Sequence, residues 1–186
     1  MKLDQNLNVV LKTSVGMLHS TPVTYEVFEK YFDVIAKAHS RLNEREYTSL
    51  ASSKIAYLML KKVAEEDGVW EGPEGVQKGL MNEIYRLSNL VMSTDKGWET
   101  LPLHTVVMKE MISLPERREV DNALCFFTLV SLMESKAITT WKCQGLAEYW
   151  GGLVTSQNCT EYATSLKTST VTEPTPKKET QSSIPS

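Results

Sequence analysis

Long apolar runs and paired cysteines are both scarce in this chain of 186 residues. No segment comes near the roughly 18 consecutive apolar residues that a membrane-spanning helix needs, so we expect no integral membrane protein and no membrane partner. The opening MKLDQNLNVV has polar and acidic residues where a signal peptide needs apolar ones, which predicts no export. The three cysteines are an odd number and exclude a fully paired disulfide framework. A protein of the reducing cytoplasm is the natural interpretation.

An excess of either charge sign is lacking too. The chain has 20 Lys and Arg against 23 Asp and Glu, a formal net charge of −3. Lys61-Lys62 and Arg117-Arg118 are isolated basic pairs, whereas general nucleic-acid binding usually needs a basic stripe with many phosphate contacts. We therefore expect no nucleic-acid partner. The composition, 41% hydrophobic and 23% charged, is otherwise typical of a globular protein with a buried core.

Residue spacings that signal catalysis or metal binding are absent as well. His19, His39 and His104 are far apart and show no metal-ligand spacing. The cysteines form no C-x-x-C pair, and Cys125, in the apolar run ALCFF, is expected to be a small buried side chain. The glycines of the segment 72–79 lack the Lys-Ser/Thr ending of a phosphate-binding loop. We predict no enzyme, with no catalytic, cofactor-binding or metal-binding residue and no cofactor.

What the sequence does contain divides it into three parts. Residues 1–23 are predicted as a β-hairpin segment, because NVVLKT at 8–13 and Met17-Leu18 flank a turn near Gly16. Residues 24–154 are predicted as a helical domain. Residues 155–186 form a polar tail with fourteen Ser or Thr, and we expect disorder from about residue 167, where too little apolar surface remains to offset the entropy of ordering.

Apolar residues at helical spacing indicate the helices of the central part. They predict helices near 24–42, 44–66, 76–91, 103–114, from 115 onward, and, shorter, 138–150. The fold class expected is mainly α: five to six helices with a small N-terminal β-hairpin and a disordered Ser/Thr/Pro-rich C-terminal tail. The predicted core comprises Phe28, Phe32, Ile35, Leu58, Leu80, Ile84, Leu87, Val91, Leu124 and Phe127.

Two groups of apolar and aromatic residues are candidates for binding a partner. The first is Trp98 with Leu101, in the expected loop GWETLPL. The second lies near the end of the ordered part and comprises Trp141, Leu146, Tyr149 and Trp150. Packing in the protein's own core is the alternative for both groups. As a binding site, either group would offer an exposed apolar patch or groove to a helix from another protein.

Several segments resemble proteins of long-tailed bacteriophages. They are MKLDQNLNVVL, HSTPVTYEVFEKYF, EIYRLSNLV, GWETLPL, EVDNALCFFTLVS, VTSQNCTEYATSL and the final SSIPS. The family resembled is encoded in the tail module of siphovirus-type phages, near the tape measure protein, and is usually taken to consist of tail assembly chaperones. The lambda-type chaperone is more weakly similar, through the Tyr85–Ser88 segment, a short β start and a polar C-terminal extension.

The resemblance implies a protein of the host cytoplasm that binds the tape measure protein and keeps that chain soluble. It further implies recruitment of tail tube subunits, with release when the tube assembles. The tape measure protein, the tail tube (major tail) protein and self-association are the partners it suggests. Three alternatives stay open: a minor tail protein retained in the virion, a small helical DNA-binding regulator, and an enzyme that uses a cysteine or histidine.

Overall fold

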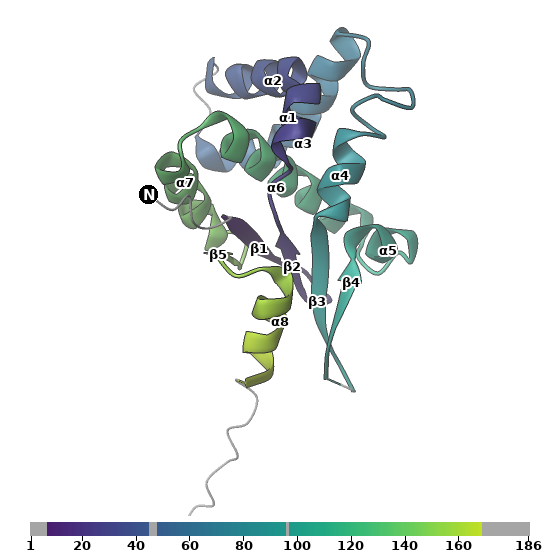
Figure 1. Cartoon of the computed structure of the whole chain (residues 1–186), viewed down its shortest axis with the longest axis vertical. Helices are drawn as coiled ribbons and strands as arrows, with labels where there is room; N and C mark the ends of the chain where they lie inside the picture. The colour runs from purple at the N-terminus through teal and green to yellow at the C-terminus, as the bar shows by residue number, and fades with distance from the viewer. Residues whose placement is uncertain (1–6, 45–47, 96, 169–186) are drawn as a thin grey trace, which may run out of the picture.

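The computed structural model describes residues 7–44, 48–95 and 97–168. This part of the chain contains eight helices and five strands (Figure 1). The strands are β1 (Asn8–Lys12), β2 (Met17–Ser20), β3 (Ser88–Thr94), β4 (Gly97–Pro102) and β5 (Leu153–Thr155). The helices are α1 (Tyr25–Lys30), α2 (Phe32–Glu44), α3 (Ser49–Glu66), α4 (Leu80–Arg86), α5 (Leu103–Met108), α6 (Leu114–Met133), α7 (Lys136–Ala147) and α8 (Cys159–Thr168).

A five-stranded antiparallel sheet contradicts the prediction of a mainly α fold with a small hairpin. The strand order is β4-β3-β2-β1-β5, so the fold is mixed α and β. β1 and β2 pair as antiparallel neighbours within the predicted N-terminal segment, but both lie in the interior of the sheet. The strands from residues 88–102 and 153–155 complete the sheet on either side, so β1 and β2 are the middle of a larger sheet.

The prediction of a helix near 76–91 is wrong for the second half of that range. α4 ends at Arg86, and β3 begins at Ser88. The spacing of Leu87 and Val91 continues the helical pattern, but Val91 lies opposite Met17 in the β2–β3 ladder. The Ser88 hydroxyl hydrogen-bonds the Ile84 carbonyl and the Ser20 hydroxyl at the junction, both at 2.8 Å. Pairing with a distant strand therefore outweighs the local periodicity, as tertiary context commonly does.

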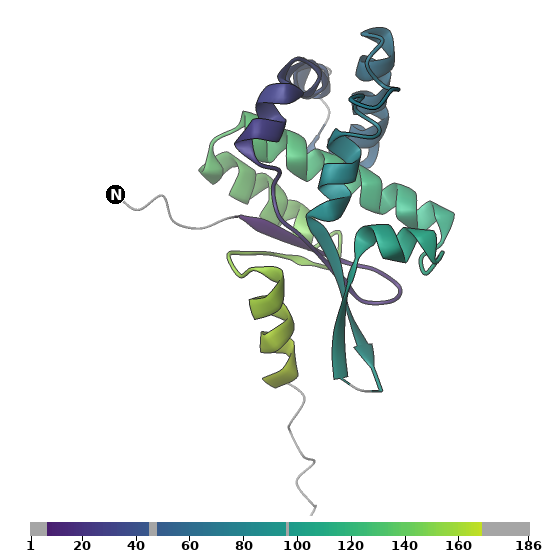
Figure 2. The same ribbon diagram turned by 45° about the vertical axis from the view of Figure 1, so that its right-hand side comes forward.

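The two faces of the sheet are covered unequally (Figures 1 and 2). Leu11, Leu18 and Leu90 belong to the main hydrophobic core, which the sheet shares with the larger helices. Val10 and Val91 belong to a smaller cluster with Tyr162 and Ala163 of α8, on the opposite face. This division follows from the alternation of side chains along each strand. α8 is thus the helix that covers the second face.

Helix α8 is fastened to the sheet by polar contacts at its start. The Gln157 carbonyl accepts hydrogen bonds from His19 Nε2 at 2.8 Å and from Asn8 Nδ2 at 2.9 Å. Asn158 and Glu161 cap the helix reciprocally, each accepting from the other's backbone N–H. His19 is fully buried, and burial lowers its pKa. Residues 155–168 of the predicted polar tail are therefore structured, and residues 169–186 lie outside the described part of the chain.

The main core surrounds α6. Nearly every residue of α6 from 120 to 130 is buried, because the helix contacts α2, α3, α4 and α7. Six predicted core residues are buried: Ile35, Leu80, Ile84, Val91, Leu124 and Phe127. Phe28 and Leu87 are partly buried against the core. The prediction is wrong for Phe32 and Leu58, which are 47% and 58% exposed.

A break at Tyr31 explains the error at Phe32. α1 ends there, with φ −112° and ψ 19°, and α2 starts at the next residue. The buried Tyr31 side chain donates its hydroxyl to the Glu74 carbonyl at 3.2 Å. Phe32 lies outside the core-facing side of α2. That side consists of Val34, Ile35, Ala38 and Leu42.

Candidate partner-binding surface

The described part of the chain contains an open groove of about 610 Å³. It lies where the β1–β2 turn, α3, the first half of α6 and the α7–β5 connection meet. Its lining comprises Leu11, Lys12, Thr13, Ser14, Ser53, Lys54, Glu116, Glu119, Val120, Asn122, Ala123, Tyr149 and Trp150. Apolar side chains and charges of both signs therefore face the same space. We call this feature the mixed groove.

One side of the mixed groove is set by Glu116. Its carboxylate accepts hydrogen bonds from the Ser14 backbone N–H at 2.5 Å and from the Ser14 hydroxyl at 2.7 Å. Glu116 is in the first turn of α6, where the helix dipole favours a carboxylate, and Ser113 caps that turn by accepting from the Glu116 N–H. These contacts hold the β1–β2 turn against α6.

The other side is aromatic. Tyr149 is 54% exposed, and the Lys54 ammonium lies over its ring at 5.1 Å from the centroid. Trp150 is partly buried and packs edge-on against Phe126, with ring centroids 6.3 Å apart. The Trp150 carbonyl accepts from the Lys12 backbone N–H at 3.2 Å. Trp150 thus belongs to the framework of the groove, whereas Tyr149 presents its ring to solvent.

The outer face of α7 adds a second exposed aromatic. Trp141 is 71% exposed and Ile138 46% exposed, and a side chain at Gly145 would meet nothing within 4 Å. Leu146, by contrast, is buried and packs in the main core. Of the four residues predicted in this group, Trp141 and Tyr149 are available for contact, Trp150 is half-buried, and Leu146 is a core residue.

The other predicted group is not a loop and does not join this surface. Trp98 and Leu101 are in strand β4, which corrects the expected loop GWETLPL. They point to opposite faces of the sheet: Trp98 packs in the cluster under α8, and Leu101 packs against the main core. Successive side chains along a strand point to opposite faces, so two residues three positions apart lie on opposite faces of the sheet.

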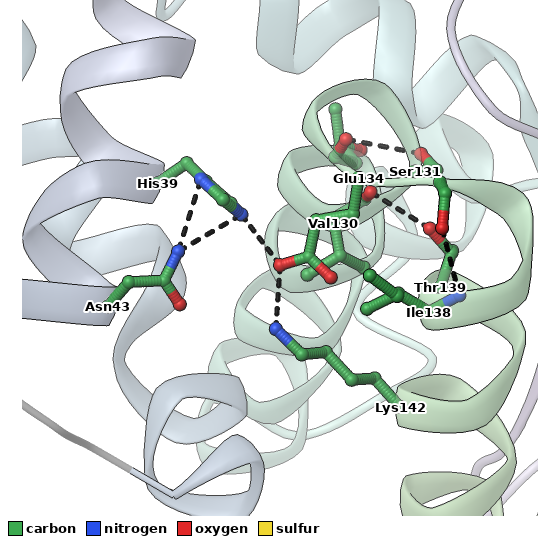
Figure 3. Close-up of polar contacts among 10 residues, drawn as sticks. His39, Asn43, Val130, Ser131, Glu134, Ile138, Thr139 and Lys142 are labelled. Atoms are coloured by element: carbon green, nitrogen blue, oxygen red, sulfur yellow. Dashed lines mark hydrogen bonds and ion pairs between the residues drawn. The ribbon is translucent and has the colours of Figure 1, made fainter.

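A buried polar cluster fixes α7 to the helices beneath it (Figure 3). Glu134 Oε1 lies 2.8 Å from His39 Nε2 and accepts from Lys142 Nζ at 2.6 Å. Burial of the Glu134 carboxylate acts to raise its pKa, but the hydrogen bonds from Lys142 and His39 outweigh burial and lower the pKa. Lys142 is therefore engaged inward, on the same helix that exposes Trp141.

The remaining nucleophilic groups lie away from the mixed groove. Burial raises the pKa of the Cys143 thiol to about 12 and that of Cys125 well above its ordinary value. Cys159, half-buried in α8, also has a pKa raised by burial. The hydrogen bonds found between described residues join none of these thiols to a histidine. No group of three or more metal-ligating side chains occurs among residues 7–44, 48–95 and 97–168.

Sequence reasoning missed most of the groove. The sequence does not single out Lys54 or Asn122, and it predicts Glu116 and Glu119 only as solvated side chains of a helix. Lys54 and Glu116 lie 62 positions apart, and neither belongs to a motif. The signal that was present is the aromatic content at 149–150.

Comparison with protein-family models, with curated proteins and with solved structures finds no match in any of the three. None of the helices in the described part of the chain combines the length and apolar character needed to cross a bilayer. The interpretation of the surface therefore depends on its geometry and on the resemblance described above.

Proposed function

We propose that this protein is a phage tail assembly chaperone that binds helical segments of the tape measure protein through the mixed groove and the outer face of α7. The observation that carries the proposal is the exposure of two aromatic side chains, Tyr149 in the lining of the groove and Trp141 on α7. Exposed aromatic side chains next to a concave surface are typical of protein-binding sites.

The chemistry of the groove suits an amphipathic helix. Leu11, Val120 and Ala123 line the groove but are buried, so Tyr149 supplies the exposed apolar surface for one side of such a helix. Lys12 and Lys54 can pair with acidic side chains, and Glu119 can pair with basic ones. A tape measure protein is a very long helical chain with apolar seams, which are exposed before the tail tube encloses them. Covering those seams would prevent aggregation.

Release at tube assembly calls for modest affinity at each site. Many copies bound along one tape measure chain would supply the total affinity through multivalency. In this proposal the tail tube protein displaces the copies, and self-association along the tape measure would support the coating. The protein would act in the host cytoplasm and leave before the virion is complete.

Co-expression with the tape measure protein of the same phage tests the proposal. We expect the soluble fraction of the tape measure to rise with this protein and to return to the unassisted level with the double variant Trp141→Ala, Tyr149→Ala. Met108→Ala, which removes another exposed apolar side chain, 72% exposed on α5, is the matched control and should retain the effect. Equal solubility with and without the protein would refute the proposal.

Mass spectrometry of purified particles addresses the alternative of a virion component. A chaperone should be absent from mature phage. Recovery of this chain in a fixed ratio to the tube protein would instead identify a minor tail protein.

A further inference from the structure

Three aromatic rings form a continuous row on the outside of α1 and α2. The Tyr25 and Phe28 ring centroids are 5.9 Å apart, and those of Phe28 and Phe32 are 5.5 Å apart. Tyr25 is 69% exposed and Phe32 47% exposed. We call these three residues the aromatic row. It shares no residue with the mixed groove.

The spacing of the row is that of a helix-packing seam. The residues follow one another by three and then four positions, as do the a and d positions that face a partner helix in a coiled coil. Backbone bonding continues through the break, because the Tyr31 N–H bonds to the Val27 carbonyl and the Ile35 N–H to the Tyr31 carbonyl. The row therefore runs along α1 and crosses the break at Tyr31 to the first residue of α2.

Of the three rings, only Phe28 packs against the protein's own core, where it is partly buried. α2 faces the core with Val34, Ile35, Ala38 and Leu42. In both overall views α1 and α2 lie at the end of the molecule remote from α8 (Figures 1 and 2). Large aromatic side chains left in water forgo the free energy of burial, so the two exposed rings, Tyr25 and Phe32, indicate a surface that a second molecule covers.

Charges beside the row identify the kind of molecule. Glu26, Glu29 and Asp33 are exposed and, among the described residues, have no ion-pair or hydrogen-bond partner. The neighbouring cations are occupied: Lys30 pairs with Glu74, and Lys37 pairs with Asp67 at 2.7 Å. The side of the helix next to the row is thus acidic. Pairing with the same face of a second copy would bring carboxylates together, which disfavours self-association here.

We propose that the aromatic row docks an amphipathic helix of a protein partner whose apolar seam is flanked by Lys or Arg residues. The rings would fill the partner's seam, and Glu26, Glu29 and Asp33 would pair with its cations. This site is additional to the mixed groove and goes beyond the proposed function. It gives the molecule two binding surfaces of different charge character.

Two designed helical peptides test the site on the full chain. Both carry the same leucine seam; one has Lys at the flanking positions, and the other has Glu. Fluorescence anisotropy should show that the Lys-flanked peptide binds more tightly, with an affinity that falls as salt is raised. Equal affinity for the two peptides would overturn the proposal.

Variants assign the binding to the row. Tyr25→Ala with Phe32→Ala should weaken binding by at least about tenfold, the scale of an interface aromatic. Tyr25→Phe should bind as the unaltered protein does, because the ring and not the hydroxyl makes the contact. Glu29→Lys with Asp33→Lys should reverse the peptide preference. Unchanged binding in the double alanine variant, with circular dichroism showing an intact fold, would refute the assignment.

Trp141→Ala separates this proposal from the preceding one. It should reduce tape measure solubilisation and leave peptide binding unaltered. Loss of peptide binding in Trp141→Ala, with retention in the variant that lacks Tyr25 and Phe32, would place the site in the mixed groove and refute the proposal for α1 and α2.

Discussion

Replacing Tyr85 by Phe removes one buried hydroxyl and should destabilise the protein by an amount that depends on pH. Tyr85 of α4 donates to Asp121 Oδ1 of α6 at 2.5 Å, and both residues are buried. Arg117 lies 3.9 Å from the other carboxylate oxygen. A hydrogen bond to a charged group contributes about 1.5–3 kcal/mol, so we expect a loss of about 2 kcal/mol at neutral pH. For a chain of this length, that corresponds to a fall in Tm of about 4–8 °C.

The pH dependence follows from Asp121. Burial raises its pKa, while the Tyr85 hydrogen bond and Arg117 act to lower it. Because the pKa in the folded state is above that in the unfolded state, this group stabilises the fold most below its unfolded pKa of about 3.9, and the contribution is lost as pH rises through the folded pKa. Removing the Tyr85 hydroxyl raises that pKa further. The destabilisation by Tyr85→Phe should therefore be larger at pH 7 than near pH 4.

Urea unfolding of the two proteins at both pH values measures this difference. Tyr57→Phe is the matched control: Tyr57 is partly buried, it packs against Trp70, and its hydroxyl has no hydrogen bond among the described residues. We expect a change below about 0.5 kcal/mol for the control. A loss for Tyr85→Phe that is equal at both pH values would refute the role assigned to the carboxylate.

Three further predictions concern other contacts. Tyr162→Ala removes the buried tyrosine of α8 and should release that helix from the sheet. Hydrogen exchange at residues 159–166 should then be faster, while the main core stays protected. Glu134→Gln should lower the free energy of unfolding by about 1–3 kcal/mol at pH 7, because Lys142 loses its carboxylate partner. The pKa of Glu134 is lowered in the folded state, so its stabilising contribution is present above the unfolded pKa and is lost in acid. The variant and the parent should therefore become equally stable in urea unfolding as the pH falls below about 4. Gly152→Ala would place Cβ 1.8 Å from the Val10 carbonyl oxygen and should reduce stability by about 1–3 kcal/mol, measurable as a lower Tm.

Sequence signals predicted the structure correctly where an element depends on residues close to it in the chain. Pro115 and Glu116 predict a helix that starts near residue 115, and the structure begins α6 at Leu114, with Ser113 as its cap. The same reasoning failed for β3 and β4, because a strand is stabilised by partners elsewhere in the chain. The ladder from Asn89↔Pro102 to Thr94↔Gly97 leaves little trace in the composition of GWETLP, which shows no alternation of apolar and polar residues.

The candidate surface was predictable only in part, for a similar reason. The aromatic residues at 141 and 149–150 were noticeable in the sequence, but their exposure depends on which side of α7 faces α6. The aromatic row shows the converse error. The spacing predicted burial of Phe28 and Phe32. Phe28 is partly buried against the core, but the prediction is wrong for Phe32, because α2 begins after the break at Tyr31 and packs on the core through Val34 and Ile35.

The strand order has a consequence for synthesis on the ribosome. β1 is made well before residues 153–155, with which its outer edge pairs. Until translation reaches that point, the edge of β1 presents unpaired backbone groups, which are a template for association with other chains. Nascent chains of this protein would therefore expose the edge of β1 until β5, which is three residues long, is made and pairs with it.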